Sequence, residues 1–219
     1  MTRVIAIDGP AGSGKSSVSR SVAAGLGYAF LDTGAAYRAL TWLALDKGVD
    51  VHDSAAVEEL MDNFDYSISL DPAIERVSVG GVDVTSEIRD PRISLAVSAI
   101  ASQLPIRSAM VDMTRDLAQS TDFPGVVVEG RDNTTVVFPD ADVRVLLTAR
   151  EDVRIERRSR ETTADTSVTE QSIRERDESD STVVEFRTAA DGVHVVDSSD
   201  LSFDETVEAI LNLCERRKP

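Results

Sequence analysis

Gly9-Pro-Ala-Gly-Ser-Gly-Lys-Ser16 is the stretch of sequence that decides the fold of this chain. It follows an apolar run, Val4-Ile5-Ala6-Ile7, and it precedes residues 15–26, whose apolar side chains recur with helical periodicity. The stretch matches the pattern Gly-x4-Gly-Lys-Ser of phosphate-binding loops in full. The alternative, a Gly-rich turn with a chance Gly-Lys-Ser, would not need a strand before it and a helix after it. The loop therefore predicts a nucleotide-binding α/β fold, and by itself it leaves the reaction open.

Each part of this loop has a chemical task. The glycines let several backbone N–H groups face one anion, and the following helix adds its positive end. Lys15 can reach the β- and γ-phosphates of ATP, and the Ser16 hydroxyl can bind Mg²⁺. The expected ATP-binding residues are Gly9, Pro10, Ala11, Gly12, Ser13, Gly14, Lys15, Ser16 and Ser17.

Short apolar segments alternate with helical segments along most of the chain, which predicts a parallel sheet covered by helices. Besides the first strand, the predicted strands are 28–31, 126–128, 143–147 and 194–196, and the predicted helices are 33–46, 90–102, 105–119, 150–160 and 203–216. Residues 64–84 differ, because they hold short alternating segments separated by Asp71-Pro72 and Gly80-Gly81 turns. We interpret them as a small antiparallel insert. Ser202 and Glu205 form a capping box at the start of the last helix, and Ser167 and Glu170 form another.

Composition limits the possible functions. The formal net charge of −16 disfavours nucleic acid as a partner, because a phosphate backbone needs a basic surface. No stretch approaches the roughly 20 apolar residues of a membrane span, and the N-terminus has no signal-peptide pattern. Cys214 is the one cysteine, so no internal disulfide can form. These features predict a cytoplasmic protein without a membrane partner.

Arginines supply 20 of the 23 basic residues, and several stand where a phosphoryl group would travel. Arg150, Arg154, Arg157 and Arg158 share one face of a predicted helix, so they could belong to a lid that closes over ATP. The alternative is a solvated, salt-bridged face with Glu151, Asp152 and Glu156. Arg38 stands on the second predicted helix, after the Asp32-Thr33-Gly34 turn, and Arg131 stands just past a buried strand, at the edge of the sheet where ligands bind. Together they could form a second phosphate site that faces the glycine-rich loop. A codon bias towards arginine would explain the excess without any function.

The chain resembles the bacterial cytidylate kinases over essentially its full length. The stretches that carry the resemblance are Ile7–Ser16, Leu31–Arg38, Val84–Arg89, Glu129–Asp132, Val136–Asp140, Arg174–Asp177, Ala189–Asp191 and Val196–Ser199. The resemblance implies a P-loop three-layer fold with a central parallel five-stranded sheet. It implies a core of about 1–32, 104–150 and 170–219, an enlarged nucleotide-monophosphate insert of about 33–103, and a short lid of about 151–169.

The implied reaction is ATP-dependent, Mg²⁺-assisted phosphorylation of CMP and dCMP by a monomer. The implied catalytic residues are Lys15, Arg131, Arg157 and Arg158, with Ser16 on the metal. Cytosine would be read by Ser98, Arg107 and Asp132, with Thr33 near the base. The acceptor phosphate would contact Arg38 and Arg131, and the ribose would contact Arg176 and Asp180.

Three positions depart from the family's pattern. Val183 replaces a further phosphate arginine, and we hypothesise that Arg187 takes over its contact. Asn133-Thr134-Thr135 lacks the glycine that usually follows Gly-Arg-Asp, which affects the loop that carries Asp132. Ser102 lies near Ser98 and leaves the alignment of that segment open.

Two other functions fit the loop. Another small-molecule P-loop kinase, of the shikimate or gluconate type, would share the phosphate site, but it would lack the large insert and the Gly-Arg-Asp motif. A non-catalytic nucleotide switch would need only one set of phosphate-binding cations. The two sets in this chain favour two substrates.

Overall fold

The structure is a computed structural model that describes residues 2–161 and 188–216; the side chains of residues 158, 160 and 161 are not described. Its central sheet has the strand order β2-β6-β1-β7-β8, and all neighbouring strands are parallel. The strands are β1 (Arg3–Asp8), β2 (Ala29–Asp32), β6 (Gly125–Gly130), β7 (Val143–Thr148) and β8 (His194–Asp197). The predicted five-stranded parallel sheet is therefore confirmed.

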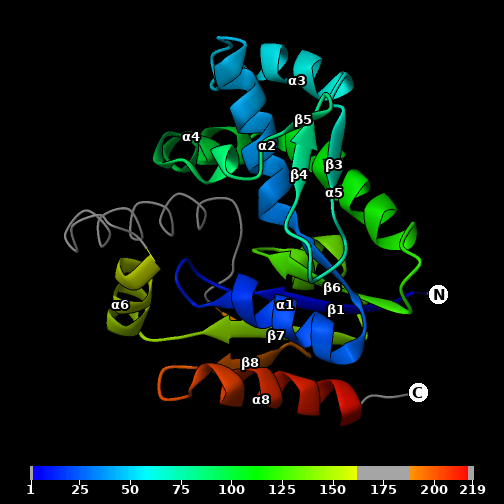
Figure 1. Cartoon of the computed structure of the whole chain (residues 1–219), viewed down its shortest axis with the longest axis vertical. Helices are drawn as coiled ribbons and strands as arrows, with labels where there is room; N and C mark the ends of the chain where they lie inside the picture. The colour runs from blue at the N-terminus through cyan, green and yellow to red at the C-terminus, as the bar shows by residue number, and fades with distance from the viewer. Residues whose placement is uncertain (1, 162–187, 217–219) are drawn as a thin grey trace.

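Helices cover both faces of this sheet (Figure 1). On one face, α1 (Lys15–Leu26) and α8 (Phe203–Arg216) pack against the apolar side chains of β1 and β7, such as Ile5 and Val145. On the other face, the end of α5 (Leu104–Gln119) packs against β2 and β6. Because successive side chains of a strand point to opposite faces, a buried parallel strand needs apolar residues throughout, as in Val126-Val127-Val128.

The segment between β2 and α5 forms a second lobe, drawn above the sheet in Figure 1. It contains α2 (Thr33–Asp46), α3 (Ser54–Asp62), β3 (Tyr66–Ile68), β4 (Val77–Val79), β5 (Val82–Asp83), the 3-10 turn η1 (Glu87–Arg89) and α4 (Pro91–Ala101). Strands β3, β4 and β5 pair antiparallel, which confirms the predicted small antiparallel insert. Helix α3 was not predicted from the sequence.

The carboxyl ends of β1, β2 and β6 meet at one edge of the sheet, because parallel strands all end on the same side. β1 leads into the glycine-rich loop, β2 ends at Asp32 beside Glu129 of β6, and β6 leads into the π-helical turn η2 (Asn133–Val137). Helix α6 (Glu151–Glu161) follows β7 at the same edge, at the left of Figure 1. The glycine-rich loop, the turn after β6 and helix α6, which the sequence predicted to carry chemistry, therefore all start at this edge.

Within the described ranges, no single helix is long and apolar enough to cross a membrane; α4 and α5 would have the length and composition only as a pair, and they meet at 102°.

Candidate active site

A cavity of about 790 Å³ lies at this edge of the sheet, between the glycine-rich loop and the second lobe. Twelve of the predicted site residues line it: Ala11, Gly12, Gly14, Lys15, Ser16, Ser17, Thr33, Arg38, Ser98, Arg107, Arg131 and Asp132. Gly9, Pro10 and Ser13 belong to the same loop and support it from behind. Arg176, Asp180, Val183 and Arg187 lie outside the described residues, as does the side chain of Arg158.

The glycine-rich loop has the backbone that its sequence predicts. Gly12 and Gly14 have φ of 74° and 83°, a left-handed conformation that costs a residue with a Cβ atom free energy. Gly14 is the N-cap of α1, so the first turn of this helix, whose N–H groups have no acceptor within the helix, begins at the cavity-lining residues Lys15 and Ser16. A Cβ on Gly12 would lie 2.7 Å from the backbone oxygen of Arg154, so the loop also packs tightly against α6.

Two arginines of α6 bind the carbonyl groups of this loop. Arg154 donates to the Ala11 oxygen at 2.8 Å, and Arg157 donates to the Ser13 oxygen at 3.3 Å. Arg157 also donates to the backbone oxygen of Ser198 at 2.7 Å, so it ties the loop to the segment after β8. The arginine face of α6 is thus directed at the phosphate loop.

Arg150 precedes α6 and belongs to a different contact. Its two terminal nitrogens bind Asp200 at 3.0 Å, and its Nε lies 3.7 Å from Asp152. The salt-bridged alternative raised by the sequence therefore describes Arg150, and the contacts of Arg154 and Arg157 with the loop fit the other interpretation.

Two more arginines bring positive charge to the cavity. Arg38, on α2, is 5% exposed and donates to the Ile88 oxygen at 3.1 Å and to the Ser94 hydroxyl at 2.9 Å. Arg131 follows β6 and donates to the Gly9 oxygen at 3.0 Å. Cations therefore approach the cavity from both the insert and the core.

Arg107 and Asp132 form an ion pair in the cavity wall, with only 15% and 11% of their side chains exposed. Arg107 also donates to the Ala101 oxygen at 3.2 Å, which fixes its guanidinium at the end of α4. Ser98 and Ser102 both line the cavity, so its geometry accommodates either alignment of that segment. The pair presents a hydrogen-bond donor and an acceptor side by side, a pattern that suits a planar heterocycle carrying both kinds of group.

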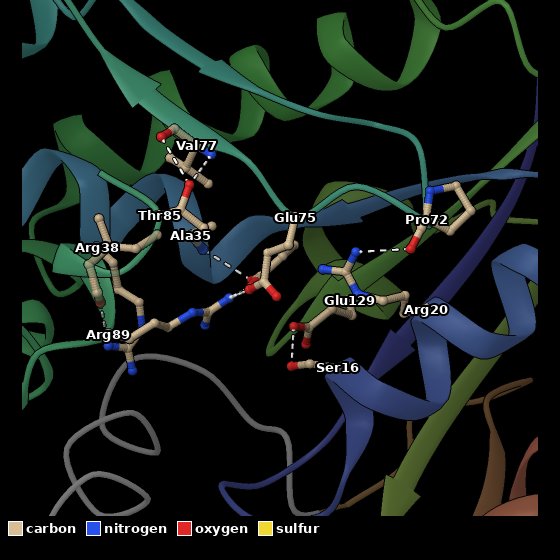
Figure 2. A network of polar contacts seen from close by, with 12 residues as sticks. Ser16, Arg20, Ala35, Arg38, Pro72, Glu75, Val77, Thr85, Arg89 and Glu129 are labelled. Carbon is tan, nitrogen blue, oxygen red and sulfur yellow. Dashed lines mark hydrogen bonds and ion pairs between the residues drawn. The ribbon is translucent and has the colours of Figure 1, made fainter. Parts of the chain in front are cut away.

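Two buried carboxylates for which the sequence motifs indicate no role also line the cavity. Asp32 and Glu129 are register neighbours on β2 and β6 and are 5% and 2% exposed. Glu129 accepts a hydrogen bond from the Ser16 hydroxyl at 2.6 Å (Figure 2), and its Oε2 is buried without a hydrogen-bond partner among the described residues. Burial and the neighbouring Asp32 raise the pKa of Glu129 to about 7. Burial acts to raise the pKa of Asp32 as well, but Arg89 at 3.1 Å and the more distant Arg38 and Lys15 outweigh it and lower that pKa.

A third buried carboxylate, Asp8, holds the loop that carries Asp132. It accepts hydrogen bonds from the backbone N–H groups of Asn133 at 3.0 Å and Thr134 at 2.7 Å, at the start of η2. Gly130 lies directly before this loop in close packing: a Cβ there would be 2.3 Å from the Thr33 hydroxyl oxygen. The loop that departs from the family's pattern is therefore fixed to β1 through its backbone.

The sequence contained one usable signal for these acids. Asp8, Asp32 and Glu129 each stand at or next to the carboxyl end of an apolar strand, where ligands of parallel sheets bind. Arg89 gave no such signal, because it follows no strand of the central sheet.

Comparison with known proteins identifies relatives over the whole length. The sequence model of the family described as cytidylate kinase matches residues 5–216. The cytidylate kinase of Cutibacterium acnes is 45% identical over 96% of this chain and 95% of its own. That of Streptomyces avermitilis is 39% identical over 98% of this chain and 94% of its own.

Solved structures share the fold at low identity. A Thermus thermophilus protein is 17% identical, with a TM-score of 0.52 and coverage of 100% of this chain and 99% of its own. A Eubacterium ventriosum protein is 12% identical, with a TM-score of 0.56 and coverage of 99% and 100%. At such identities these two structures bear on the fold alone.

Proposed function

The chain belongs to the cytidylate kinase family, and we propose that the cavity at the carboxyl edge of its sheet is where it transfers the γ-phosphoryl group of ATP to CMP or dCMP. It is an ATP-dependent kinase of these nucleoside monophosphates. The observation that carries the assignment of the site is the meeting of two sets of cations in one cavity. The phosphate loop supplies Lys15, and Arg38 of the insert and Arg131 after β6 supply the other set.

The chemistry assigned to the cavity is positioning and charge neutralisation. An oxygen of the acceptor phosphate attacks the γ-phosphorus in line, and that phosphate is mostly ionised at pH 7, so the step needs no general base. Lys15 and Arg131 neutralise the charge that spreads over the transferred group. Arg157 supports them by holding the loop, and Arg158 is proposed to join them.

The base of the acceptor would occupy the part of the cavity near α4. The Asp132 carboxylate can accept a hydrogen bond from the amino group of cytosine, while Arg107 donates to its carbonyl oxygen and ring nitrogen. Uracil has a carbonyl oxygen in place of the amino group and a ring N–H in place of the ring nitrogen. The first would oppose the contact with Asp132, and the second would oppose the contact of Arg107 with the ring nitrogen. Ser98 and Thr33 would complete the base site, and Arg176 and Asp180 would bind the ribose.

Mg²⁺ is expected to arrive with ATP, and the residues present fit it. The buried Oε2 of Glu129 has no partner among the described residues, and Oε1 of the same carboxylate binds the Ser16 hydroxyl. Mg²⁺ typically keeps several waters and takes one or two protein groups together with phosphate oxygens. Ser16 and Glu129 would supply those groups. The bound ion would neutralise the charge of the β- and γ-phosphates. Among the described residues, no group of three or more His, Cys, Asp or Glu side chains could hold a metal without the nucleotide.

For the protein as a whole, we propose a monomeric cytoplasmic enzyme with one kinase domain, divided into a core, an insert over about 33–103 and a lid over about 151–169.

The direct test is turnover of CMP, dCMP, UMP, AMP and shikimate with ATP and Mg²⁺, for the wild-type protein and for Lys15→Ala. We expect turnover of CMP and dCMP. The Lys15→Ala variant should lose about 3 kcal/mol or more of transition-state stabilisation, roughly a hundredfold in rate or more. Lys47→Ala is the matched control, because Lys47 is exposed at the end of α2 and does not line the cavity. Preferred turnover of shikimate, or near-normal turnover by Lys15→Ala, would contradict the proposal.

A further inference from the structure

Arg89 reaches the centre of the site from the second lobe, and no role has been given to it so far. It ends η1, lines the cavity, and has 43% of its side chain exposed. Its Nη2 lies 3.1 Å from Asp32 of the core and 3.2 Å from Glu75 of the loop before β4. Arg89 and Glu75 are labelled in Figure 2. This arginine therefore connects the two lobes through Asp32, while Glu75 binds it from its own lobe.

Only one nitrogen of this guanidinium makes these contacts. Nη1 and Nε of Arg89 have no hydrogen-bond partner in the part of the chain that the structure describes. A guanidinium carries five N–H donors in a rigid fork that matches the geometry of a phosphate. Most of the donors of Arg89 thus remain available, on a side chain that borders the cavity.

The charges around Arg89 indicate which ligand these donors would meet. Arg38 binds the carbonyl oxygen of Ile88, the residue directly before Arg89, so both arginines are held by the same turn. Arg89 also acts electrostatically on Glu129, which binds Ser16 of the phosphate loop. The guanidinium thus lies beside the turn that binds Arg38 and close enough to Glu129 to act on its charge.

The acceptor phosphate needs a cation at this place. A phosphate dianion that enters the cavity comes close to the buried carboxylates Asp32 and Glu129, which repel it. Arg38 and Arg131 can offset its own two charges, whereas the largest offset of the charge on Asp32 comes from Arg89, ahead of Arg38 and Lys15. A third cation that is already paired with Asp32 would offset this repulsion, and Glu75 is an exposed partner that Arg89 could leave at small cost.

We propose that Arg89 is a third arginine for the acceptor phosphate, held in position by Asp32 and Glu75 until the nucleotide arrives. The phosphate monoester then binds the available edge of the guanidinium, while Asp32 keeps its ion pair. This inference rests on the proposed function, because it assigns a further contact to the same acceptor.

The test compares the affinities of CMP and cytidine for the wild-type protein, Arg89→Met and Arg89→Lys, by calorimetry or, for the weaker nucleoside, by NMR titration. Cytidine lacks the phosphate, so it separates a phosphate contact from a general effect on the fold. We expect Arg89→Met to weaken CMP binding about tenfold to a hundredfold, the usual effect of one hydrogen bond to a charged group, and cytidine binding less than twofold. Arg89→Lys keeps the charge without the fork and should fall between the two. Arg92→Met is the matched control, because Arg92 is an exposed arginine outside the cavity and should change neither affinity.

A second arm removes the competing carboxylate instead of the arginine. Glu75→Gln should tighten CMP binding about two- to fivefold, and the gain should vanish when it is combined with Arg89→Met. Equal loss of CMP and cytidine affinity in Arg89→Met, or an unchanged ratio between them, would overturn the proposal. So would a gain from Glu75→Gln that persists without Arg89. Wild-type turnover of CMP is measured first, because its absence would contradict the proposed function and not merely the role of Arg89.

Discussion

Separating the ion pair of Arg107 and Asp132 should reveal both a structural and a recognition role. Arg107→Met removes the guanidinium and keeps most of the aliphatic volume, so the Asp132 carboxylate loses its partner in the cavity wall. That carboxylate lies close to Asp8, a second acid that is 2% exposed and whose pKa is raised by burial and further by Asp132. The variant therefore leaves an unpaired, mostly buried carboxylate beside another acid.

The expected loss follows from the burial of the pair. Removing one partner of a buried ion pair costs about 3–5 kcal/mol, and the 15% and 11% exposure of these side chains favours the lower end, about 3 kcal/mol. For a chain of this size, each kcal/mol shifts the Tm by about 2–4 °C, so the Tm should fall by about 6–12 °C. Arg107→Met combined with Asp132→Asn should recover at least half of this loss, because it removes the stranded charge. The recovery stays incomplete, since the hydrogen bond to the Ala101 oxygen is lost in both variants.

The assay combines urea unfolding with steady-state kinetics for the wild type, both single variants and the double variant. All three variants should lose about a hundredfold or more of kcat/KM for CMP, because an unpaired polar group would face the base, while ADP affinity should stay unchanged. A double variant no more stable than Arg107→Met would refute the reasoning about the stranded charge. Near-normal kcat/KM for CMP in any variant would refute the assignment of the base site.

Other parts of the structure predict further outcomes. The pKa of Glu129 is raised to about 7 by burial and a neighbouring carboxylate, so the contribution of its protonated form to stability is full at low pH and is lost as the pH rises toward 8. In urea unfolding without nucleotide or metal, Glu129→Gln should therefore be about 3 kcal/mol more stable than the wild type at pH 8 and similar to it at pH 5. Parallel pH profiles of the two proteins would contradict this. Cys214 is fully buried, and this burial raises the pKa of its thiol to about 11. At pH 8 it should therefore react with a thiol reagent at least a hundredfold more slowly than free cysteine, until urea unfolds the protein. Rapid reaction of the native protein would show that this part of the core opens. A Cβ at Gly130 would lie 2.3 Å from the Thr33 hydroxyl oxygen and 2.5 Å from Asn133 Nδ2. Gly130→Ala should therefore cost about 1–3 kcal/mol of stability in urea unfolding and reduce CMP turnover. A variant with wild-type stability and kinetics would show that these side chains move aside without cost.

Sequence patterns predicted the elements of this fold wherever a periodic apolar pattern is local. Helix α8 spans the residues that its periodicity indicated, and its capping box is present, because Ser202 N–H binds the Glu205 carboxylate at 2.8 Å and Glu205 N–H binds the Ser202 hydroxyl at 3.2 Å. The turn η2 could not be predicted in this way. Asp8 binds its first N–H groups and Arg115 binds its last carbonyl oxygens, and both residues lie far from it in the sequence.

Long sequence separation also limited the prediction of the site. Lys15, Arg38, Arg107 and Asp132 were recognised by motif or resemblance, and the structure brings them to one cavity. The pair Arg89–Asp32 spans 57 residues, and nothing in either local sequence indicates the other partner. Likewise, the spacing of the α6 arginines predicted a shared face, but it could not identify carbonyl groups as their partners, since every residue of the chain has one.

Arg154 and Arg157 of α6 determine the direction of the backbone amides of the phosphate loop as well as its position. In a planar trans peptide, the C=O and the following N–H point in opposite directions. Because Arg154 holds the Ala11 oxygen and Arg157 holds the Ser13 oxygen on the outside, the N–H groups of Gly12 and Gly14 are directed toward the inside. The loop is thus preorganised, and the entropy cost of orienting its amides is met when the protein folds, not when ATP binds. Loss of either arginine would then appear as a less favourable entropy of nucleotide binding, although neither side chain need touch the phosphates.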